Sequence, residues 1–233
     1  MQTHSGARCA PGEISLAHHG VLFLDELAEF PRRVLDALRE PLETGTVCVS
    51  RAARRAEYPA SFQLVAAMNP CPCGYHGEPG RCRCGEEEIR RYQSRVSGPL
   101  LDRIDLVVAL RRERALSHDP VESSDTIAVR VRAAVAVQQR RQGIGNARLP
   151  PRALRALAPP GSAVQRLLST ACERLPLSRR SVDRILAVAR TVADLDAREV
   201  LTGADIAEAL SFRADGTSAV AVDAQHSVAG MSG

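Results

Sequence analysis

Short apolar runs and helical patterns alternate over the first half of the chain. Val21–Leu24 and Phe62–Met68 are apolar runs bounded by polar residues, and runs of this length predict buried strands. A further run over 104–110 predicts a third strand. Between the first two runs, Pro31 suits the first turn of a helix whose apolar spacing continues to Gly45, which ends it.

Three smaller elements complete this half. Val47–Ser50 and Glu57–Pro59 flank an arginine-rich tip, so that a hairpin is predicted there. Glu13–His19 forms a short predicted helix. Glu86–Val96 forms a longer one, and its three acids in the first turn suit the positive end of the helix dipole.

From about residue 121 the pattern is helical throughout. Thr202 followed by Asp205 resembles a capping box at the start of the last helix. The segment 214–233, rich in Ala, Gly and Ser, is predicted to be a disordered tail. The predicted helices are 124–142, 151–157, 161–174, 179–195 and 203–212. This order predicts an α/β core followed by an α-helical domain.

Composition narrows the class of protein. A hydrophobic content of 45% and a charged content of 25% are typical of a soluble globular chain. No apolar run approaches the roughly 20 residues of a membrane span, and residues 1–13 lack the apolar centre of a signal peptide. We therefore expect no membrane partner and a cytoplasmic location. All 31 basic residues are arginine. Aromatic residues make up 3%, so that stacking sites for single-stranded nucleic acid are sparse.

Two adjacent acids, Asp25 and Glu26, follow the first predicted strand. Phosphoryl transfer to water needs a magnesium ion held against the phosphates and a carboxylate that orients the attacking water. Asp25 can hold the magnesium ion, and Glu26 can orient the attacking water. The alternative is that both acids only cap the following helix.

Three further polar residues can complete such a site. Asn69 ends the second predicted strand, and ligands gather at the carboxyl ends of parallel strands, although Asn-Pro is also a turn signal. Arg103 precedes the third predicted strand and can neutralise developing charge on a neighbour's nucleotide, or form a surface ion pair. In the helical region, Arg180 is the first candidate for a further residue of this site, and Arg184, one turn later, is the alternative to it.

The order of these parts resembles a known family. GVLFLDELAEF resembles a Walker B motif, VAAMNP a sensor 1 segment, SGPLLDRIDL an arginine-finger segment and LSRRSVDRILAVARTVADL a sensor 2 helix. Together they resemble the magnesium-chelatase-like branch of AAA+ ATPases, from about Pro11 to Arg213. The strings SLAHHG and NPCPCG are most similar to a family member that acts in natural transformation, which implies a DNA motor promoting branch migration.

The resemblance implies a fold and a set of roles. The fold would be an AAA+ core with an incomplete, partly parallel sheet over 1–120, then an α-helical lid over 121–213. The complete family member would be a hexameric ring that uses Mg-ATP at sites shared between neighbours. The implied roles are magnesium binding for Asp25, a base-like role for Glu26, a polar sensor for Asn69, a finger acting in trans for Arg103 and a second sensor for Arg180.

One part of the family's site is not in this sequence. The family binds the β and γ phosphates with a glycine-rich loop that ends in Lys-Ser or Lys-Thr. No such loop precedes Asp25, and the chain has no lysine. We therefore expect a truncated family member that by itself neither binds ATP tightly nor hydrolyses it.

Four of the seven cysteines lie in one short loop. Cys71, Cys73, Cys82 and Cys84 form two C-x-C pairs separated by eight residues, a spacing that allows tetrahedral thiolate coordination of a structural zinc ion. Four free thiols, or His76 in place of one cysteine, are the alternatives. The isolated cysteines Cys9, Cys48 and Cys172 are predicted to be ordinary residues.

The predicted hairpin tip carries the best candidates for DNA contact. Arg51, Arg54 and Arg55 can meet the phosphate backbone, or they form a solvated turn. Arg81 and Arg83, in the cysteine loop, are a second basic patch. Three interpretations stay open: a DNA motor segment, a chelatase-type motor acting on a protein or a tetrapyrrole enzyme, and a non-catalytic module that binds DNA or caps a ring.

Overall fold

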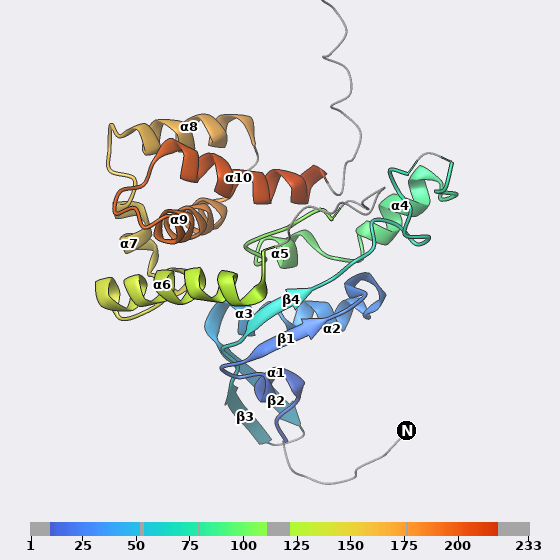
Figure 1. Cartoon of the computed structure of the whole chain (residues 1–233). Coiled ribbons are helices and arrows are strands. Elements are labelled where there is room, and N and C mark those ends of the chain that lie inside the picture. Colours follow the sequence, from blue (N-terminus) through green and yellow to red (C-terminus); the bar gives the residue numbers. More distant parts are fainter. Residues whose placement is uncertain (1–9, 52–53, 79, 111–121, 176, 219–233) are drawn as a thin grey trace, which may run out of the picture. The chain divides into compact units, whose positions relative to one another are not determined.

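The computed structural model describes residues 10–51, 54–78, 80–110, 122–175 and 177–218 (Figure 1). The chain folds as two units, 1–104 and 105–233. Unit 1 contains, in chain order, α1 (Glu13–Leu16), β1 (Val21–Leu24), the 3-10 helix η1 (Leu27–Glu29), α2 (Arg32–Ala37), α3 (Pro41–Thr44), β2 (Thr46–Arg51), β3 (Arg54–Pro59), β4 (Gln63–Ala66), α4 (Glu86–Gln93) and α5 (Gly98–Leu101). Unit 2 contains α6 (Ser124–Gln142), the 3-10 helix η2 (Asn146–Arg148), α7 (Pro151–Ala156), α8 (Ala163–Arg174), α9 (Arg179–Leu195) and α10 (Gly203–Ser218).

The first two predicted strands are confirmed and lie side by side. β1 and β4 pair in parallel, with Leu24 opposite Ala66. Alternate side chains of a strand point to opposite faces, and Leu22 and Leu24 pack on the core of this unit. The other face leaves Val21 and Phe23 exposed, with Phe23 at 59% of its full accessible surface. The described part of unit 1 therefore covers only one face of this sheet.

Helices cover the inner face of that sheet. The buried core consists of Leu27, Leu35, Leu38, Val96 and Leu100. The prediction of one helix from Pro31 to Gly45 is wrong in one respect, because α2 ends at Ala37 and a new helix, α3, begins at Pro41. Proline lacks the N–H that would continue a helix but suits a first turn. Gly45 ends α3 with φ of 72°, as predicted for a left-handed cap.

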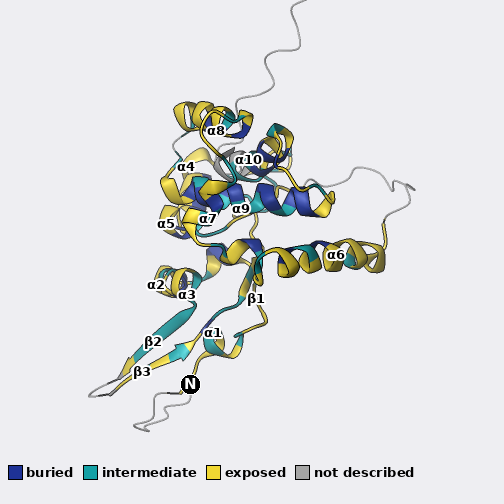
Figure 2. Ribbon diagram, turned by 90° about the vertical axis from the view of Figure 1, so that its left-hand side faces the viewer, coloured by how far each residue is buried: buried dark blue, intermediate teal, exposed yellow. Residues whose placement is uncertain are grey.

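The predicted hairpin is confirmed. β2 and β3 are antiparallel, with Thr46 opposite Pro59 and Arg51 opposite Arg54. Its tip, residues 52–53, lies outside the described residues. In Figure 2 exposed and partly buried residues alternate along the described part of β3, as expected for a strand with one face in solvent.

The predicted third strand over 104–110 is wrong. The described residues of this segment form no strand, and the N–H of Val107 donates instead to the carbonyl oxygen of Phe212 at 3.0 Å. The side chains of Leu106, Val108 and Leu110 are exposed. A strand requires a paired neighbour, and no described strand pairs with this apolar run.

Unit 2 is helical, as predicted. α6 and α9 have the predicted bounds, and α7 and α8 differ from theirs by one or two residues. α10 extends beyond 212 to Ser218, into the segment predicted as a tail, while 219–233 lie outside the described residues. Figure 2 shows α9 as the most buried helix and α6 as largely exposed. The core packs around Ile185, Leu186 and Ala189 of α9 and Ile206 of α10.

A buried carboxylate ties three elements of this unit together. Asp194 of α9 has no exposed side-chain surface, and Arg141 of α6 binds it through two hydrogen bonds of 2.6 and 2.9 Å. Arg190 lies 3.0 Å from the same carboxylate, and Asn146 of η2 donates to it at 2.8 Å. Burial by itself would raise the pKa of Asp194, but the hydrogen bonds from Arg141 and Asn146 outweigh it and lower this pKa.

A second buried acid caps the last helix. Asp205 accepts two hydrogen bonds from Arg198, of 2.6 and 2.7 Å. It also accepts from the N–H of Thr202 at 2.7 Å, which is the return bond of the predicted capping box.

None of the helices within the described residues has the length and apolarity needed to cross a lipid bilayer.

Replacing Asp194 with Asn should lower the free energy of unfolding by about 3 kcal/mol, because it leaves Arg190 buried without a counter-charge. The effect should be measured by urea denaturation at pH 7. Because the native pKa of Asp194 is lowered, its stabilisation should be complete above the ordinary aspartate pKa of about 3.8 and should disappear as the pH falls further.

The matched control is Asp196→Asn. Asp196 also pairs with an arginine, Arg198 at 2.6 Å, but its side chain is 61% exposed. Exposed pairs contribute less than about 1 kcal/mol. Equal losses in the two variants would contradict the structural role assigned to Asp194.

Candidate functional site

The acids after β1 lie at the carboxyl edge of the parallel sheet. Asp25 and Glu26 are both exposed, and Glu26 adopts a left-handed conformation with φ of 51°. The N–H of Glu26 donates to Oδ1 of Asp25 at 2.9 Å. The chain then turns into η1, and the N–H of Leu27 donates to the carbonyl oxygen of Ala67 at 2.9 Å. This bond ties the turn that carries the acids to the end of β4.

Asn69 lies at the same edge. It follows β4 by three residues, and β4 is the parallel neighbour of β1. A Cβ atom built on Gly74 would lie 3.7 Å from Oδ1 of Asn69. The structure therefore brings Asp25, Glu26 and Asn69 to one edge of the sheet, and the amide oxygen of Asn69 lies near Gly74 of the cysteine loop.

Arg103 is held inside unit 1. Its side chain is 12% exposed, and one guanidinium nitrogen lies 2.5 Å from Glu43. The other donates to the carbonyl oxygen of Pro99 at 2.7 Å. Contact with a neighbouring molecule would require Arg103 to leave Glu43. The sequence offered no signal for this partner, because Glu43 is 60 residues away along the chain.

The predicted second sensor belongs to unit 2. Arg180 is exposed in the first turn of α9, which Ser178 caps by accepting from the N–H of Ser181 at 3.1 Å. Arg184, one turn further along, forms an ion pair with Asp105.

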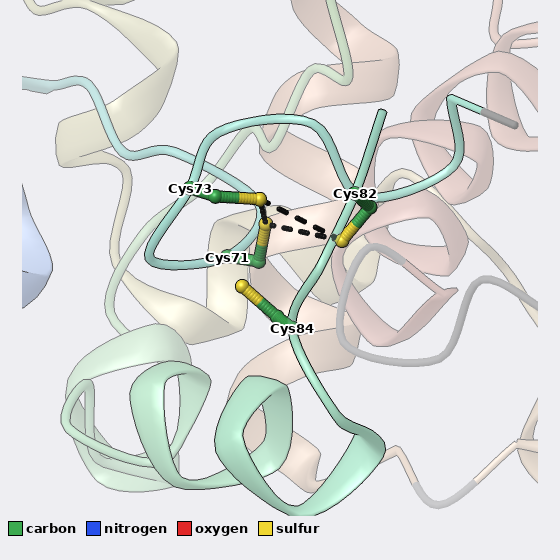
Figure 3. Close-up of side chains that lie close together, drawn as sticks. All are labelled: Cys71, Cys73, Cys82 and Cys84. Carbon is green, nitrogen blue, oxygen red and sulfur yellow. Dashed lines mark hydrogen bonds between the residues drawn. The ribbon is translucent and has the colours of Figure 1, made fainter. Parts of the chain in front are cut away.

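The four loop cysteines converge on one point (Figure 3). The Sγ atoms of Cys71, Cys73 and Cys82 lie 3.4, 3.7 and 3.9 Å apart, and all four sulfur atoms, including that of Cys84, lie within 4.8 Å of one another. A tetrahedral zinc site with Zn–S distances of about 2.3 Å separates its sulfur atoms by about 3.8 Å. The cluster therefore has the dimensions of a tetrathiolate metal centre.

His76 is not a member of this group. The interpretation in which it replaces a cysteine loses its support, because the four thiols already meet.

The protonation of the thiols is uneven. The backbone N–H groups of Arg83 and Tyr75 lower the pKa of Cys73 to about 6. Burial, together with the neighbouring thiols of Cys73 and Cys71, raises the pKa of Cys84 to about 12. The surroundings of Cys73 therefore favour its thiolate form, while those of Cys84 favour its protonated form. A bound cation removes this difference between Cys73 and Cys84, because it favours the thiolate form at every ligand.

The end of α4 holds the start of the cysteine loop. Gln93 is 4% exposed, and its Nε2 donates to the carbonyl oxygen of Pro70 at 2.9 Å. Gln93 belongs to none of the motifs recognised in the sequence. The one signal for it was its spacing of four residues from the buried Ile89, which places an amide on the buried face of a helix.

The two arginines of this loop differ in their contacts. Arg81 binds Glu78 at 2.9 Å and lies over the ring of Tyr75 at 4.3 Å, while Arg83 is exposed.

The hairpin arginines lie at the far end of the two strands. Arg51 is opposite Arg54 in the strand register, next to the tip. Arg55 donates from Nε to Sγ of Cys48 at 2.9 Å, and this hydrogen bond raises the pKa of Arg55. Cys48 is thus a partner of one candidate for DNA contact.

The described residues fit the magnesium side of an Mg-ATP site and not its phosphate-binding side. Carboxylate and amide oxygens suit magnesium, and the exposed acids share an edge with Asn69. The phosphates need a cradle of backbone N–H groups and a lysine, and the sequence contains neither a glycine-rich phosphate loop nor a lysine.

Comparison with known proteins covers both units. The model "Magnesium chelatase, subunit ChlI" matches residues 3–117, and "Magnesium chelatase, subunit ChlI C-terminal" matches residues 121–213. The uncharacterized protein YifB of Escherichia coli K12 is 48% identical over 213 residues, which are 90% of this chain and 42% of YifB.

Two other relatives are named after the biological process in which they take part. Competence protein ComM of Haemophilus influenzae is 44% identical over 208 residues, 88% of this chain and 41% of ComM. DNA replication licensing factor Mcm6 of Drosophila melanogaster is 29% identical over 99 residues, 42% of this chain and 11% of Mcm6. The chain spans about two fifths of the length of YifB and ComM. With both family models matched in order along the sequence, the chain belongs to the magnesium-chelatase-like AAA+ family.

Proposed function

We propose that this chain is the part of a ComM-like AAA+ ATPase that carries the water-activating and sensing residues, and that the complete protein couples ATP hydrolysis to DNA branch migration. The observation that carries the proposal is the position of Asp25 and Glu26 at the carboxyl edge of β1, with Asn69 at the same edge of its parallel neighbour. The name of ComM, a competence protein, supports DNA as the partner.

The proposed roles are those that the family resemblance implies, and the positions and chemistry of the residues are compatible with them. Asp25 serves magnesium through its oxygens, and Glu26 orients the attacking water. Asn69 senses the terminal phosphate. Arg103 acts on a neighbour's nucleotide in a hexameric ring once it leaves Glu43, and Arg180 is the second sensor. The phosphate cradle must come from other residues, because this sequence contains none.

The function can be tested in a chimera of YifB in which this chain replaces the segment it matches. The chimera should hydrolyse ATP. Glu26→Gln should lower the rate by roughly 10²- to 10⁴-fold, because the water loses its base-like partner, while ATP binding persists. Hydrolysis is followed by phosphate release and binding by calorimetry.

Glu29→Gln is the matched control. Glu29 is an exposed acid three residues further along, paired with Arg95 on the surface at 3.0 Å, and its loss should leave hydrolysis unchanged. The isolated 233-residue chain should bind ATP weakly in the same calorimeter. Tight binding by the isolated chain, or full activity of Glu26→Gln, would refute the assigned roles.

DNA binding is proposed for the hairpin tip. Arg51→Ala combined with Arg54→Ala in the chimera should weaken binding to a four-way DNA junction. It should also lower the salt slope of binding by about 1 for each phosphate that the variant no longer neutralises. Fluorescence anisotropy over a range of salt concentrations measures both effects.

Arg32→Ala is the control for this experiment, because Arg32 is an exposed arginine outside the hairpin. An unchanged salt slope in the double variant would remove the hairpin from the DNA interface. DNA binding without any nucleotide dependence or hydrolysis would favour the non-catalytic module, and hydrolysis without DNA binding would favour a protein partner.

We also propose that the four-cysteine cluster holds a structural zinc ion, since four protein ligands leave no open position for catalysis. Co²⁺, which reports thiolate ligation by its absorption, should bind with a stoichiometry of one per chain. Cys84→Ser should weaken Co²⁺ binding and lower the intensity of the thiolate bands, since three thiolates remain. Affinity should rise with pH, because Cys84, with a pKa of about 12 in the metal-free chain, must lose its proton on binding.

Cys172→Ser controls for the loss of an unrelated thiol, since Cys172 is an exposed cysteine outside the cluster. Unchanged affinity and unchanged band intensity in Cys84→Ser would contradict a four-thiolate site.

A further inference from the structure

A short length of chain joins the carboxyl edge of the sheet to the cysteine cluster. Asn69 lies three residues after β4 and two residues before Cys71. On the sheet side, Ala67 donates its N–H to the carbonyl oxygen of Leu24 and accepts from the N–H of Leu27, both at 2.9 Å. The backbone before Asn69 is thus attached to β1 and to the turn that carries Asp25 and Glu26.

The backbone after Asn69 is attached to α4. The carbonyl oxygen of Pro70 accepts from Nε2 of the buried Gln93 at 2.9 Å. Cys71, the next residue, is fully buried. A fixed position for Pro70 therefore depends on a fixed position for α4.

The side chain of Asn69 also meets the loop. Gly74, which has φ of 79°, donates its N–H to the carbonyl oxygen of Cys71 at 3.0 Å and closes a turn. A Cβ atom at Gly74 would lie 3.7 Å from Oδ1 of Asn69. The turn over the first cysteine pair therefore lies close to the amide of Asn69, and its position limits the space open to that side chain.

A metal ion would close these contacts into a ring. Cys71 and Cys73 stand at the start of the loop, and Cys82 and Cys84 stand just before Gly85, which begins α4. The ring runs from Cys71 through the metal to Cys84, along α4 to Gln93, and through the Gln93 hydrogen bond back to Pro70. Pro70, the residue that follows Asn69, is thus a member of this ring. The four Sγ atoms lie within 4.8 Å of one another, and all four cysteines are free, so that no disulfide links the two pairs.

We infer that the metal centre is a positioning device: zinc bound by the four cysteines, acting through Gln93 and the turn at Gly74, sets the orientation of the Asn69 amide at the carboxyl edge of the sheet. This rests on the proposed zinc site and gives it a purpose for the proposed sensor residue. Gln93 is then a positioning residue, since it acts on Asn69 through Pro70.

The sequence allows a direct test on the 233-residue chain. It contains two asparagines, Asn69 and Asn146, so selective ¹⁵N-asparagine labelling gives two pairs of side-chain NH₂ signals in the NMR spectrum, one pair for each residue. Asn146 is 1% exposed and hydrogen-bonded to Asp194 in unit 2, and it serves as an internal reference. Asn69→Asp assigns the pair.

Adding Zn²⁺ to the metal-free chain should shift and sharpen the Asn69 amide signals and leave those of Asn146 in place. Gln93→Leu should still bind Co²⁺ with thiolate bands, but its Asn69 signals should no longer respond fully to zinc. Gln138→Leu is the matched control: Gln138 is also a buried amide, accepting from the N–H of Asn146 at 3.0 Å, and its loss should disturb Asn146 alone.

The outcomes separate the two proposals. Co²⁺ bands together with an Asn69 signal that ignores metal would overturn the positioning role and leave the zinc site standing. Absence of thiolate bands in the unaltered chain would overturn both. A normal zinc response in Gln93→Leu would remove Gln93 from the mechanism. None of these measurements uses ATP, so the ATPase proposal stands or falls separately in the chimera.

Discussion

The parallel pairing of β1 with β4 is the constraint on which the first unit depends. It places the ends of both strands at one edge, and the bonds of Ala67 to Leu24 and Leu27 extend this pairing into the turn beyond β1. The two acids and Asn69 share an edge because of it. The same pairing divides the strands into a face that packs on Leu35, Leu38 and Leu100 and a face that leaves Phe23 in solvent.

The second unit depends on a different kind of interaction. Its helices meet over an apolar core, but α6, η2 and α9 also converge on the buried carboxylate of Asp194. Buried ion pairs contribute little net stability when intact and cost much when half of the pair is removed. Here the acid binds two arginines and an asparagine, so its hydrogen-bonding capacity is used fully. In a chain without lysine, arginine supplies every such contact, and its planar guanidinium suits the two-bond geometry with Asp194 and with Asp205.

The candidate residues differ in how they are held. Asp25 and Glu26 are exposed at a sheet edge, and the backbone on either side of Asn69 is held by hydrogen bonds at Ala67 and Pro70. Arg103, by contrast, lies against Glu43 and Pro99. If it acts on a neighbouring subunit, as the family resemblance implies, that ion pair has to exchange for a contact with phosphate. The exchange replaces one charge-assisted hydrogen bond with another, so the energy difference between the two states of Arg103 is expected to be small.

Features that rest on local patterns could be predicted from the sequence. The apolar runs marked β1 and β4, helical spacing marked α6 to α9, and the capping box of Thr202 and Asp205 marked the start of α10. The order of motifs identified the family, and the C-x-C pairs marked the candidate metal-binding loop. Packing alone decided that 104–110 is no strand, that Glu43 holds Arg103, that Gln93 holds Pro70 and that Asn69 lies near the turn at Gly74. Helix and turn patterns arise from residues a few positions apart, which a sequence displays. Strand pairing and buried side-chain contacts join residues tens of positions apart, and they depend on which surfaces meet when the chain packs.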